Sequence, residues 1–348
     1  MDFISRDNLF IAESATSKIV DKPLVIGNVI LPNHLLLAPM AGVTDGPFRF
    51  LCSNLGVGAT ISELVSAKGI TMRSRQSMEM FKFQGEMRPF GIQIFGFDPD
   101  CMAEAAVYIE SLKICDFIDI NMGCPVSKVV KTGAGAALMK TPALAGKIIG
   151  AVKRAVSLPV TMKCRLGWDL SHINVRDFVK SAVDSGASAV TVHARTKAAG
   201  YTGNARWDFL EGMADICGNI PFIANGDLKS SEDLKKVHEI SGCRGFMIGR
   251  GAIGKPWIFA ELLGLDENFD KLRRYEIFRR HLVEMLMEHG SRGVALFRVH
   301  LFAYLRCHPQ ASSMRRRLCY EYDPRTILDA GKDFYESEIR DEIPMSNR

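Results

Sequence analysis

The sequence predicts an α/β protein, a (β/α)8 TIM barrel followed by a small C-terminal all-helical domain. Short apolar, β-branched runs alternate eight times with longer amphipathic stretches, and the alternation ends after Trp257-Ile258-Phe259. Most of these runs lack polar-apolar alternation, as expected for parallel strands that are covered on both faces. A doubly wound open sheet is the structural alternative, but such sheets usually have fewer strands.

The predicted strands are Leu35–Ala38, Ala59–Ser62, Phe90–Phe95, Phe117–Asn121, Val160–Cys164, Ala189–His193, Phe222–Ala224 and Gly245–Ile248. The predicted helices between them include Pro99–Ser111, Pro142–Ala155, Val175–Ser185 and Ser231–Ile240. Asp98 and Thr141 each precede a proline, which indicates a helix N-cap followed by proline in the first turn.

We therefore expect a barrel over residues 1–265, of which 1–21 form an N-terminal extension of unclear role. A helical domain is expected over residues 266–348. Its apolar positions, such as Phe278, Leu282, Met285 and Leu286, recur at helical spacing.

Composition limits the class of protein. Hydrophobic residues make up 47% and charged residues 24% of the chain, which fits a globular protein with a large core. No run of about 18 apolar residues is present, and acidic residues interrupt any signal-peptide core at the N-terminus. Nine scattered cysteines without a CxxC pair predict reduced thiols, a cytoplasmic location and neither a disulfide scaffold nor a metal site.

The net charge of +5 is modest, but basic residues are concentrated near the C-terminus. The segment Lys271–Arg317 contains eleven Lys or Arg and three acids, Glu276, Glu284 and Glu288. This segment is a candidate nucleic-acid surface. A solvated helical face is an equally good interpretation of the charge pattern alone.

Candidate functional residues lie at the ends of seven predicted strands, where a barrel of this class carries its active site. In chain order they are Pro39-Met40-Ala41, Gln93, Asn121 and Cys124, Lys163 and Arg165, His193-Ala194-Arg195, Asn225-Gly226-Asp227, and Gly249-Arg250-Gly251. Seven polar strand ends on one face of the barrel are much stronger evidence for an active site there than any single one of them would be.

The last two of these clusters indicate a phosphate site. Gly226, Gly249 and Gly251 allow backbone N–H groups to approach a ligand closely, and Arg250 supplies a charged donor. The alternative interpretation is that these glycines serve only to form tight turns and bind no ligand.

Three side chains carry further information. Lys163 lies within a run that is predicted to be a buried strand, so we expect an anionic or cofactor partner for it. His193 is at least as well explained as a hydrogen-bonded structural histidine. Cys124 follows a strand in a Gly-Cys-Pro turn, which distinguishes it from the other cysteines as a candidate catalytic group.

The chain resembles the tRNA-dihydrouridine synthase family, and its bacterial B-type branch most closely. The matching segments run in family order from about residue 22 to 265: Ala38 to Arg49, Asp119 to Pro125, Lys163 to Trp168, His193 to Thr196, Tyr201 to Gly203, Ala224 to Asp227 and Gly249 to Trp257. No counterpart is found for the residues before Asp21, and the C-terminal region matches only in length and helical character.

The resemblance implies FMN as cofactor, NADPH (or NADH) as electron donor, and reduction of the C5–C6 double bond of selected uridines in tRNA. It implies that Cys124 is the general acid that protonates C5, and that Asn121, Arg165 and Tyr201 lie near the target base. It also implies FMN contacts from Pro39, Met40, Ala41, Gln93, Lys163, His193, Asn225, Gly226, Asp227, Gly249 and Arg250. We expect the helical domain to bind tRNA, and we expect a monomer with no membrane or protein partner.

Two other functions are compatible with parts of the sequence. One is an FMN barrel reductase with a small-molecule substrate, similar to the dihydroorotate dehydrogenases, in which the equivalent cysteine or serine acts as a base. The other is a non-catalytic RNA-binding protein built on the same barrel, which the presence of both Cys124 and Lys163 disfavours.

Overall fold

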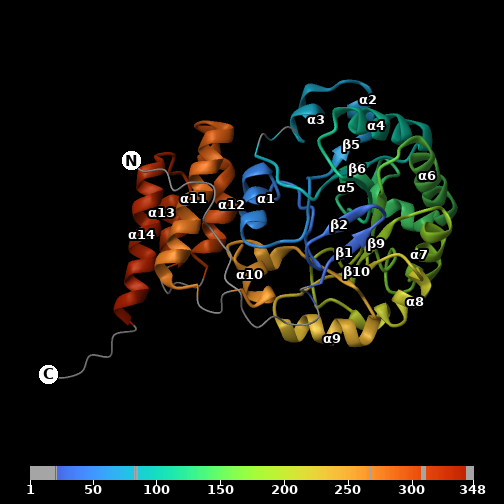
Figure 1. Ribbon diagram of the computed structural model, residues 1–348. Coiled ribbons are helices and arrows are strands. Elements are labelled where there is room, and N and C mark those ends of the chain that lie inside the picture. Colours follow the sequence, from blue (N-terminus) through green and yellow to red (C-terminus); the bar gives the residue numbers. More distant parts are fainter. Residues whose placement is uncertain are drawn as a thin grey trace.

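The computed structural model describes residues 20, 22–81, 83, 85–265, 269–306 and 311–341. Its main feature is a barrel of parallel strands (Figure 1), namely β3 (Leu35–Leu37), β4 (Thr60–Ile61), β6 (Phe90–Phe95), β7 (Phe117–Met122), β8 (Val160–Arg165), β9 (Ala189–His193), β10 (Phe222–Asn225) and β11 (Gly245–Ile248). The strands pair in the order β3-β11-β10-β9-β8-β7-β6-β4. A parallel bridge between Leu36 and Ala59 joins the two ends of this order. The predicted barrel and its eight strands are confirmed.

Helices cover the outside of the barrel. They are α1 (Gly46–Asn54), α2 (Ala67–Thr71), α3 (Arg75–Glu79), α4 (Pro99–Leu112), α5 (Ser127–Val130), α6 (Pro142–Ala155), α7 (Val175–Asp184), α8 (Met213–Cys217), α9 (Ser231–Ser241) and α10 (Ile258–Leu263), with short 3₁₀ helices η1 (Gly135–Lys140), η2 (Trp207–Leu210) and η3 (Arg250–Ala252). Asp98 caps α4 as predicted, since its carboxylate accepts from the N–H of Cys101 at 2.8 Å. Thr141 is the N-cap residue of α6 and Pro142 lies in the first turn, as predicted, but the Thr141 side chain does not form the cap. Its ψ of 67° is not extended as that of Asp98 is, and its hydroxyl makes no capping bond.

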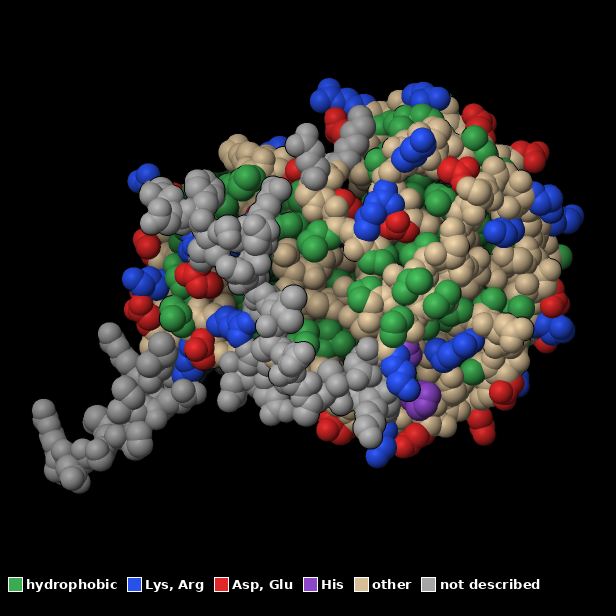
Figure 2. Space-filling model, viewed as in Figure 1, with side chains coloured by type: hydrophobic (Ala, Val, Ile, Leu, Met, Phe, Trp, Pro, Cys, Tyr) green, Lys and Arg blue, Asp and Glu red, His purple; other side chains and the backbone are tan. Residues whose placement is uncertain are grey.

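Three short strands were not predicted. β1 (Leu24–Ile26) and β2 (Val29–Leu31) form an antiparallel hairpin, and β5 (Val65–Ser66) pairs with β6. The inward side chains of the hairpin, such as Leu24 and Ile26, pack under the barrel, whereas Val25 and Ile30 are exposed. Figure 2 shows hydrophobic side chains gathered in the middle of the face on which this hairpin lies.

Four C-terminal helices stand at one side of the barrel (Figure 1): α11 (Lys271–His289), α12 (Arg292–Tyr304), α13 (Ala311–Leu318) and α14 (Pro324–Asp341). Phe278, Leu282 and Met285 are fully buried among them, as their spacing predicted. Within the described residues, no helix is long and apolar enough to cross a membrane.

These helices are attached closely to the barrel. Leu51 of α1 and Leu55, the C-cap residue of that helix, belong to the same hydrophobic cluster as Phe278. A Cβ at Gly254 would lie 2.4 Å from the carbonyl carbon of Ala303, so only glycine permits this approach of α12. His300 lies with Nε2 3.2 Å from the carbonyl oxygen of Val43, in the loop that follows β3. The C-terminal helices thereby contact a loop at the polar end of the barrel.

Candidate active site

The sequence-predicted side chains converge at the carboxyl ends of the barrel strands. The centre of the site is a chain of buried polar side chains on three neighbouring strands. Gln93 on β6 donates from Nε2 to Asp119 on β7 at 2.6 Å and accepts from Nδ2 of Asn121 at 2.8 Å. Thr161 on β8 donates to the other carboxylate oxygen of Asp119 at 2.6 Å. Sequence reasoning did not assign a role to Asp119 or Thr161, although a carboxylate inside the apolar run Phe117–Met122 was a signal.

Cys124 is held by this chain. Its N–H donates to Oδ1 of Asn121 at 2.9 Å, and its carbonyl oxygen accepts from the N–H of Ala136 at 3.0 Å. Gly135, at φ +59°, lets η1 pack against the turn, since a Cβ there would lie 2.9 Å from the Cys124 oxygen. Partial burial raises the pKa of the Cys124 thiol, although the N–H of Val126 and the cations of Arg165 and Lys163 act in the opposite direction. The thiol is therefore protonated at neutral pH, as a proton donor must be.

Lys163 projects from β8 into the same region. Its ammonium donates to Oδ1 of Asn225 at 2.9 Å, and Nδ2 of Asn225 donates in turn to the carbonyl oxygen of Met247 at 2.7 Å. Burial, assisted by the guanidinium of Arg165, lowers the pKa of Lys163 to about 8. One hydrogen bond within the described part of the chain leaves this ammonium with unused donors.

The Arg165 side chain forms hydrogen bonds to two loops at the strand ends. Its side chain is 2% exposed and donates to the carbonyl oxygens of Gly123 at 2.7 Å, Thr196 at 2.9 Å and Gly200 at 2.7 Å. The guanidinium also lies 5.3 Å from the ring centroid of Tyr201, which is 56% exposed at the rim. Arg165 thus connects the turn of Cys124 to the loop that carries Tyr201.

His193 is a neutral, buried ring. Arg195 Nη1 lies 3.2 Å from Nε2 of His193, and an arginine can only donate, so Nε2 accepts and the ring proton lies on Nδ1. Burial, followed by the positive charge of Lys163 and Arg165, holds the pKa of His193 well below its ordinary value. Arg195 is a further residue to which sequence reasoning gave no role.

The loops after β10 and β11, where the sequence predicts a phosphate site, are joined by a bond from Arg250 to Asp227. Asp227 accepts from Arg195 at 2.6 Å and from Arg250 at 2.9 Å. Burial alone would raise the pKa of this carboxyl, but the hydrogen bonds from Arg195 and Ala205 hold it below its ordinary value. Gly226, at φ +121°, requires glycine. The N–H groups of Gly226 and Gly249 donate to no group in the described residues.

The loop after β3 completes the ring of strand ends. Thr44 holds it by accepting from the N–H of Met40 at 2.8 Å. The sulfur of Met40 lies 3.5 Å from the Cβ position of Gly249, so this loop touches the candidate phosphate site. Pro39 and Met40 are partly exposed and Ala41 is exposed.

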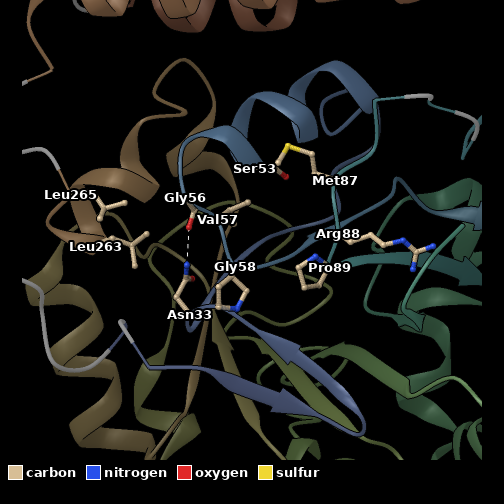
Figure 3. Close-up of a pocket in the computed structure, with 11 residues that line it drawn as sticks. Asn33, Ser53, Gly56, Val57, Gly58, Met87, Arg88, Pro89, Leu263 and Leu265 are labelled. Carbon is tan, nitrogen blue, oxygen red and sulfur yellow. Dashed lines mark hydrogen bonds between the residues drawn. The ribbon is translucent and has the colours of Figure 1, made fainter. Parts of the chain in front are cut away.

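A pocket of about 450 Å³ lies elsewhere (Figure 3). It is lined by residues that precede strands, including Asn33 before β3, Gly58 before β4 and Pro89 before β6. It is therefore at the amino ends of the strands, and none of the predicted site residues lines it. We place the candidate active site at the opposite end.

The structure divides the basic segment Lys271–Arg317 into two parts. On α11, Arg279 pairs with Glu276 at 2.8 Å and Arg280 with Glu284 at 2.6 Å, which fits a solvated helical face. On α13, Arg315, Arg316 and Arg317 are exposed and have no acidic partner within the described residues.

The sequence matches the family described as Dihydrouridine synthase (Dus) over residues 36–332. It is 42% identical over 299 residues to tRNA-dihydrouridine synthase B of Vibrio parahaemolyticus serotype O3:K6, covering 84% of this chain and 92% of that protein. It is also 42% identical over 297 residues to tRNA-dihydrouridine synthase B of Pseudomonas aeruginosa, covering 83% of this chain and 89% of the relative.

Solved structures with a similar fold include histamine dehydrogenase from Rhizobium sp. 4-9, at a TM-score of 0.53 and 14% identity, and a 2-naphthoyl-CoA reductase complex, at a TM-score of 0.56 and 10% identity. The alignments cover 77% and 70% of this chain, and the chain spans about half the length of each, 51% and 52%. These two likenesses describe the fold alone. The sequence match over most of the chain shows that the protein belongs to the dihydrouridine synthase (Dus) family.

Proposed function

We propose that this protein is an FMN-dependent tRNA-dihydrouridine synthase that reduces the C5–C6 double bond of specific tRNA uridines, with NADPH (or NADH) as electron donor. The observation that carries the proposal is the position of the Cys124 thiol. The thiol is protonated and lies close enough to Lys163 and Arg165 for their charges to act on its pKa, and the backbone N–H of the same residue donates to Oδ1 of Asn121. The family and the names of the relatives add the substrate class.

The donor groups of the site fit a flavin mononucleotide. A flavin presents carbonyl and ring-nitrogen acceptors and a phosphate, and the site offers complementary donors. Within the part of the chain that the structure describes, Lys163 has unused N–H groups, and the backbone N–H groups of Gly226 and Gly249, beside Arg250, have no acceptor. The residues that we propose to hold the cofactor are Pro39, Met40, Ala41, Gln93, Lys163, His193, Asn225, Gly226, Asp227, Gly249 and Arg250.

When bound, FMN would supply the reducing chemistry, as a hydride from N5 for C6 of the uracil. Negative charge then develops on C5 and O4 of the base, and the Cys124 S–H gives its proton to C5. The raised pKa keeps the proton on sulfur until it is needed. The uracil has to leave its stack to reach a site at the strand ends, and Tyr201 at the rim is placed to stack on it.

The surface for the rest of the tRNA is proposed on the C-terminal helices, residues 266–348 in our division of the chain. The arginines at positions 315–317 are exposed on α13 and have no acidic partner among the described residues, so they are available to bind phosphates. His300 connects α12 to the loop after β3, so tRNA bound there would adjoin the active site.

The test is direct. Purified protein is supplied with FMN, NADPH and unmodified tRNA transcripts, and the tRNA is digested to nucleosides for mass spectrometry. We expect a nucleoside that is two hydrogen atoms heavier than uridine. Turnover of dihydroorotate without any change in the tRNA would instead support a small-molecule reductase. A protein that stays colourless with FMN but binds tRNA would support a non-catalytic RNA-binding protein.

A further inference from the structure

Asp119 is one end of a hydrogen-bonded chain that reaches the backbone of Cys124. The chain runs from Asp119 to Gln93 at 2.6 Å, to Asn121 at 2.8 Å and to the N–H of Cys124 at 2.9 Å. These side chains are between 0% and 8% exposed, so water does not compete for the bonds.

The carboxylate determines the direction of every bond in this chain. Both oxygens of Asp119 accept, one from Thr161 and one from Nε2 of Gln93. The amide of Gln93 must therefore turn its oxygen towards Asn121. Asn121 then directs its own nitrogen to Gln93 and its oxygen to the backbone.

The other end of the chain agrees with this direction. Oδ1 of Asn121 accepts from the N–H of Gly123 at 3.2 Å as well as from that of Cys124. A reversed Asn121 would place its nitrogen against two N–H groups. Within the described residues the amide of Asn121 keeps a second N–H, and a donor is what a uracil oxygen that gains negative charge requires.

We propose that Asp119 is a positioning residue, which fixes the amide orientations of Gln93 and Asn121 and thereby holds the turn that carries Cys124. This inference rests on the reaction proposed above and assigns a role to a residue that does not itself touch the substrate. A merely structural role, in which Asp119 only joins β6, β7 and β8, makes different predictions.

The experiment compares Asp119→Asn with Asp119→Ala in the full-length holoenzyme. In Asp119→Asn the new amide oxygen can still accept from Gln93, because the Thr161 hydroxyl, which donates to Asp119 in the wild type, can rotate to accept from the new amide nitrogen. In Asp119→Ala, Nε2 of Gln93 loses its partner, and the orientation of both amides is no longer fixed. Thr60→Val is the matched control, because the Thr60 hydroxyl is buried and has no hydrogen-bond partner among the described residues.

Two readouts are measured for each variant. The first is kcat and KM for tRNA. The second is the rate at which iodoacetamide alkylates Cys124, followed by mass spectrometry of its peptide, which requires neither tRNA nor turnover. For Asp119→Ala we expect kcat to fall about tenfold or more with KM within about threefold of wild type. We expect alkylation of Cys124 to be about threefold faster, because the turn is released.

Asp119→Asn is expected to retain most of the activity and the wild-type alkylation rate, and Thr60→Val to match wild type in both. The inference is overturned by an Asp119→Ala variant that equals wild type in both readouts. It is equally overturned by equal losses in Asn and Ala variants that remain folded. Wild-type protein that forms no dihydrouridine would contradict the proposed reaction, while the alkylation rates would still decide the role of Asp119.

Discussion

Lys163 donates from Nζ to Oδ1 of Asn225 at 2.9 Å across the interior of the barrel. The two residues belong to β8 and β10, which are separated by β9. The contact therefore places the Lys163 ammonium near the middle of the ring of strand ends. Because the pKa of Lys163 is lowered to about 8, this group gains or loses its proton within the neutral to mildly alkaline range.

This pKa predicts a pH dependence of FMN binding. Below pH 8 Lys163 is a cation and favours an anionic ligand. Above pH 8 it is increasingly neutral, so FMN affinity decreases as the pH rises. From pH 7 to pH 9 we expect the Kd of the apoprotein for FMN to rise about tenfold, the change in the protonated fraction. The Kd is measured at each pH by titrating FMN with the apoprotein and following the flavin fluorescence.

Lys163→Met is the control for this dependence. The variant is expected to bind FMN more weakly and with a Kd that changes little between pH 7 and 9. The FMN phosphate does not confound the measurement, since its second ionisation, near pH 6, is almost complete in this range. The same steep pH dependence in Lys163→Met would assign the titration to another group.

The arginines of α13 predict the salt dependence of tRNA binding. Changing Arg315, Arg316 and Arg317 together to Ala removes three exposed cations. The Kd for tRNA should rise, and the slope of log Kd against log salt should become shallower by about one for each lost phosphate contact. The control replaces Lys153, Lys180 and Lys235, which are exposed on α6, α7 and α9. If the control lowers the slope as much as the arginine variant does, α13 is not the specific surface.

Asp45 predicts a pH-dependent stability. It caps α1 by accepting from the N–H of Phe48 at 3.0 Å, and burial, with a contribution from Glu63, raises its pKa to about 7. The folded protein binds this proton more tightly than the unfolded chain does. The resulting stabilisation is complete below pH 3.8, the ordinary value, and is lost as the pH rises through about 7.

Asp45→Asn keeps the cap and removes the charge. At pH 8 we expect it to stabilise the protein by about 1 kcal/mol, or roughly 2 °C in Tm, and at pH 5 the gain should be much smaller. Thermal unfolding at the two pH values measures this. Asp98→Asn, at the exposed cap of α4, should show no such difference. If Asp45→Asn raises the Tm by the same amount at pH 5 and pH 8, the raised pKa of Asp45 is not the cause of the stabilisation.

The parts of the structure that were predictable are those with a repeated local signal. The runs Phe90–Phe95 and Phe117–Met122 are six residues long and mostly apolar, and they form barrel strands. The hairpin of β1 and β2 was missed because each strand has three residues, too few for a period to be visible. Its turn signal, Gly27-Asn28 between two apolar triplets, was nevertheless present.

The placement of the candidate site residues at the strand ends was predictable, but the hydrogen bonds between them were not. Sequence patterns place Gln93, Asn121 and Lys163 at neighbouring strand ends. They do not reveal that Asp119 orients the amides, because that depends on strand register. Likewise, the contact of His300 with Val43 joins residues 257 positions apart, and no local signal reports it.

The measurement that tests the central claim most directly is a single turnover of Cys124→Ala beside wild type. Both proteins, with FMN reduced under anaerobic conditions, are mixed with unmodified tRNA, and dihydrouridine is measured against time. The account predicts that the variant keeps its FMN and its tRNA affinity but forms dihydrouridine about 10²-fold to 10⁴-fold more slowly, the usual contribution of a general acid. Equal rates in the two proteins would contradict the assignment of Cys124 as the proton donor.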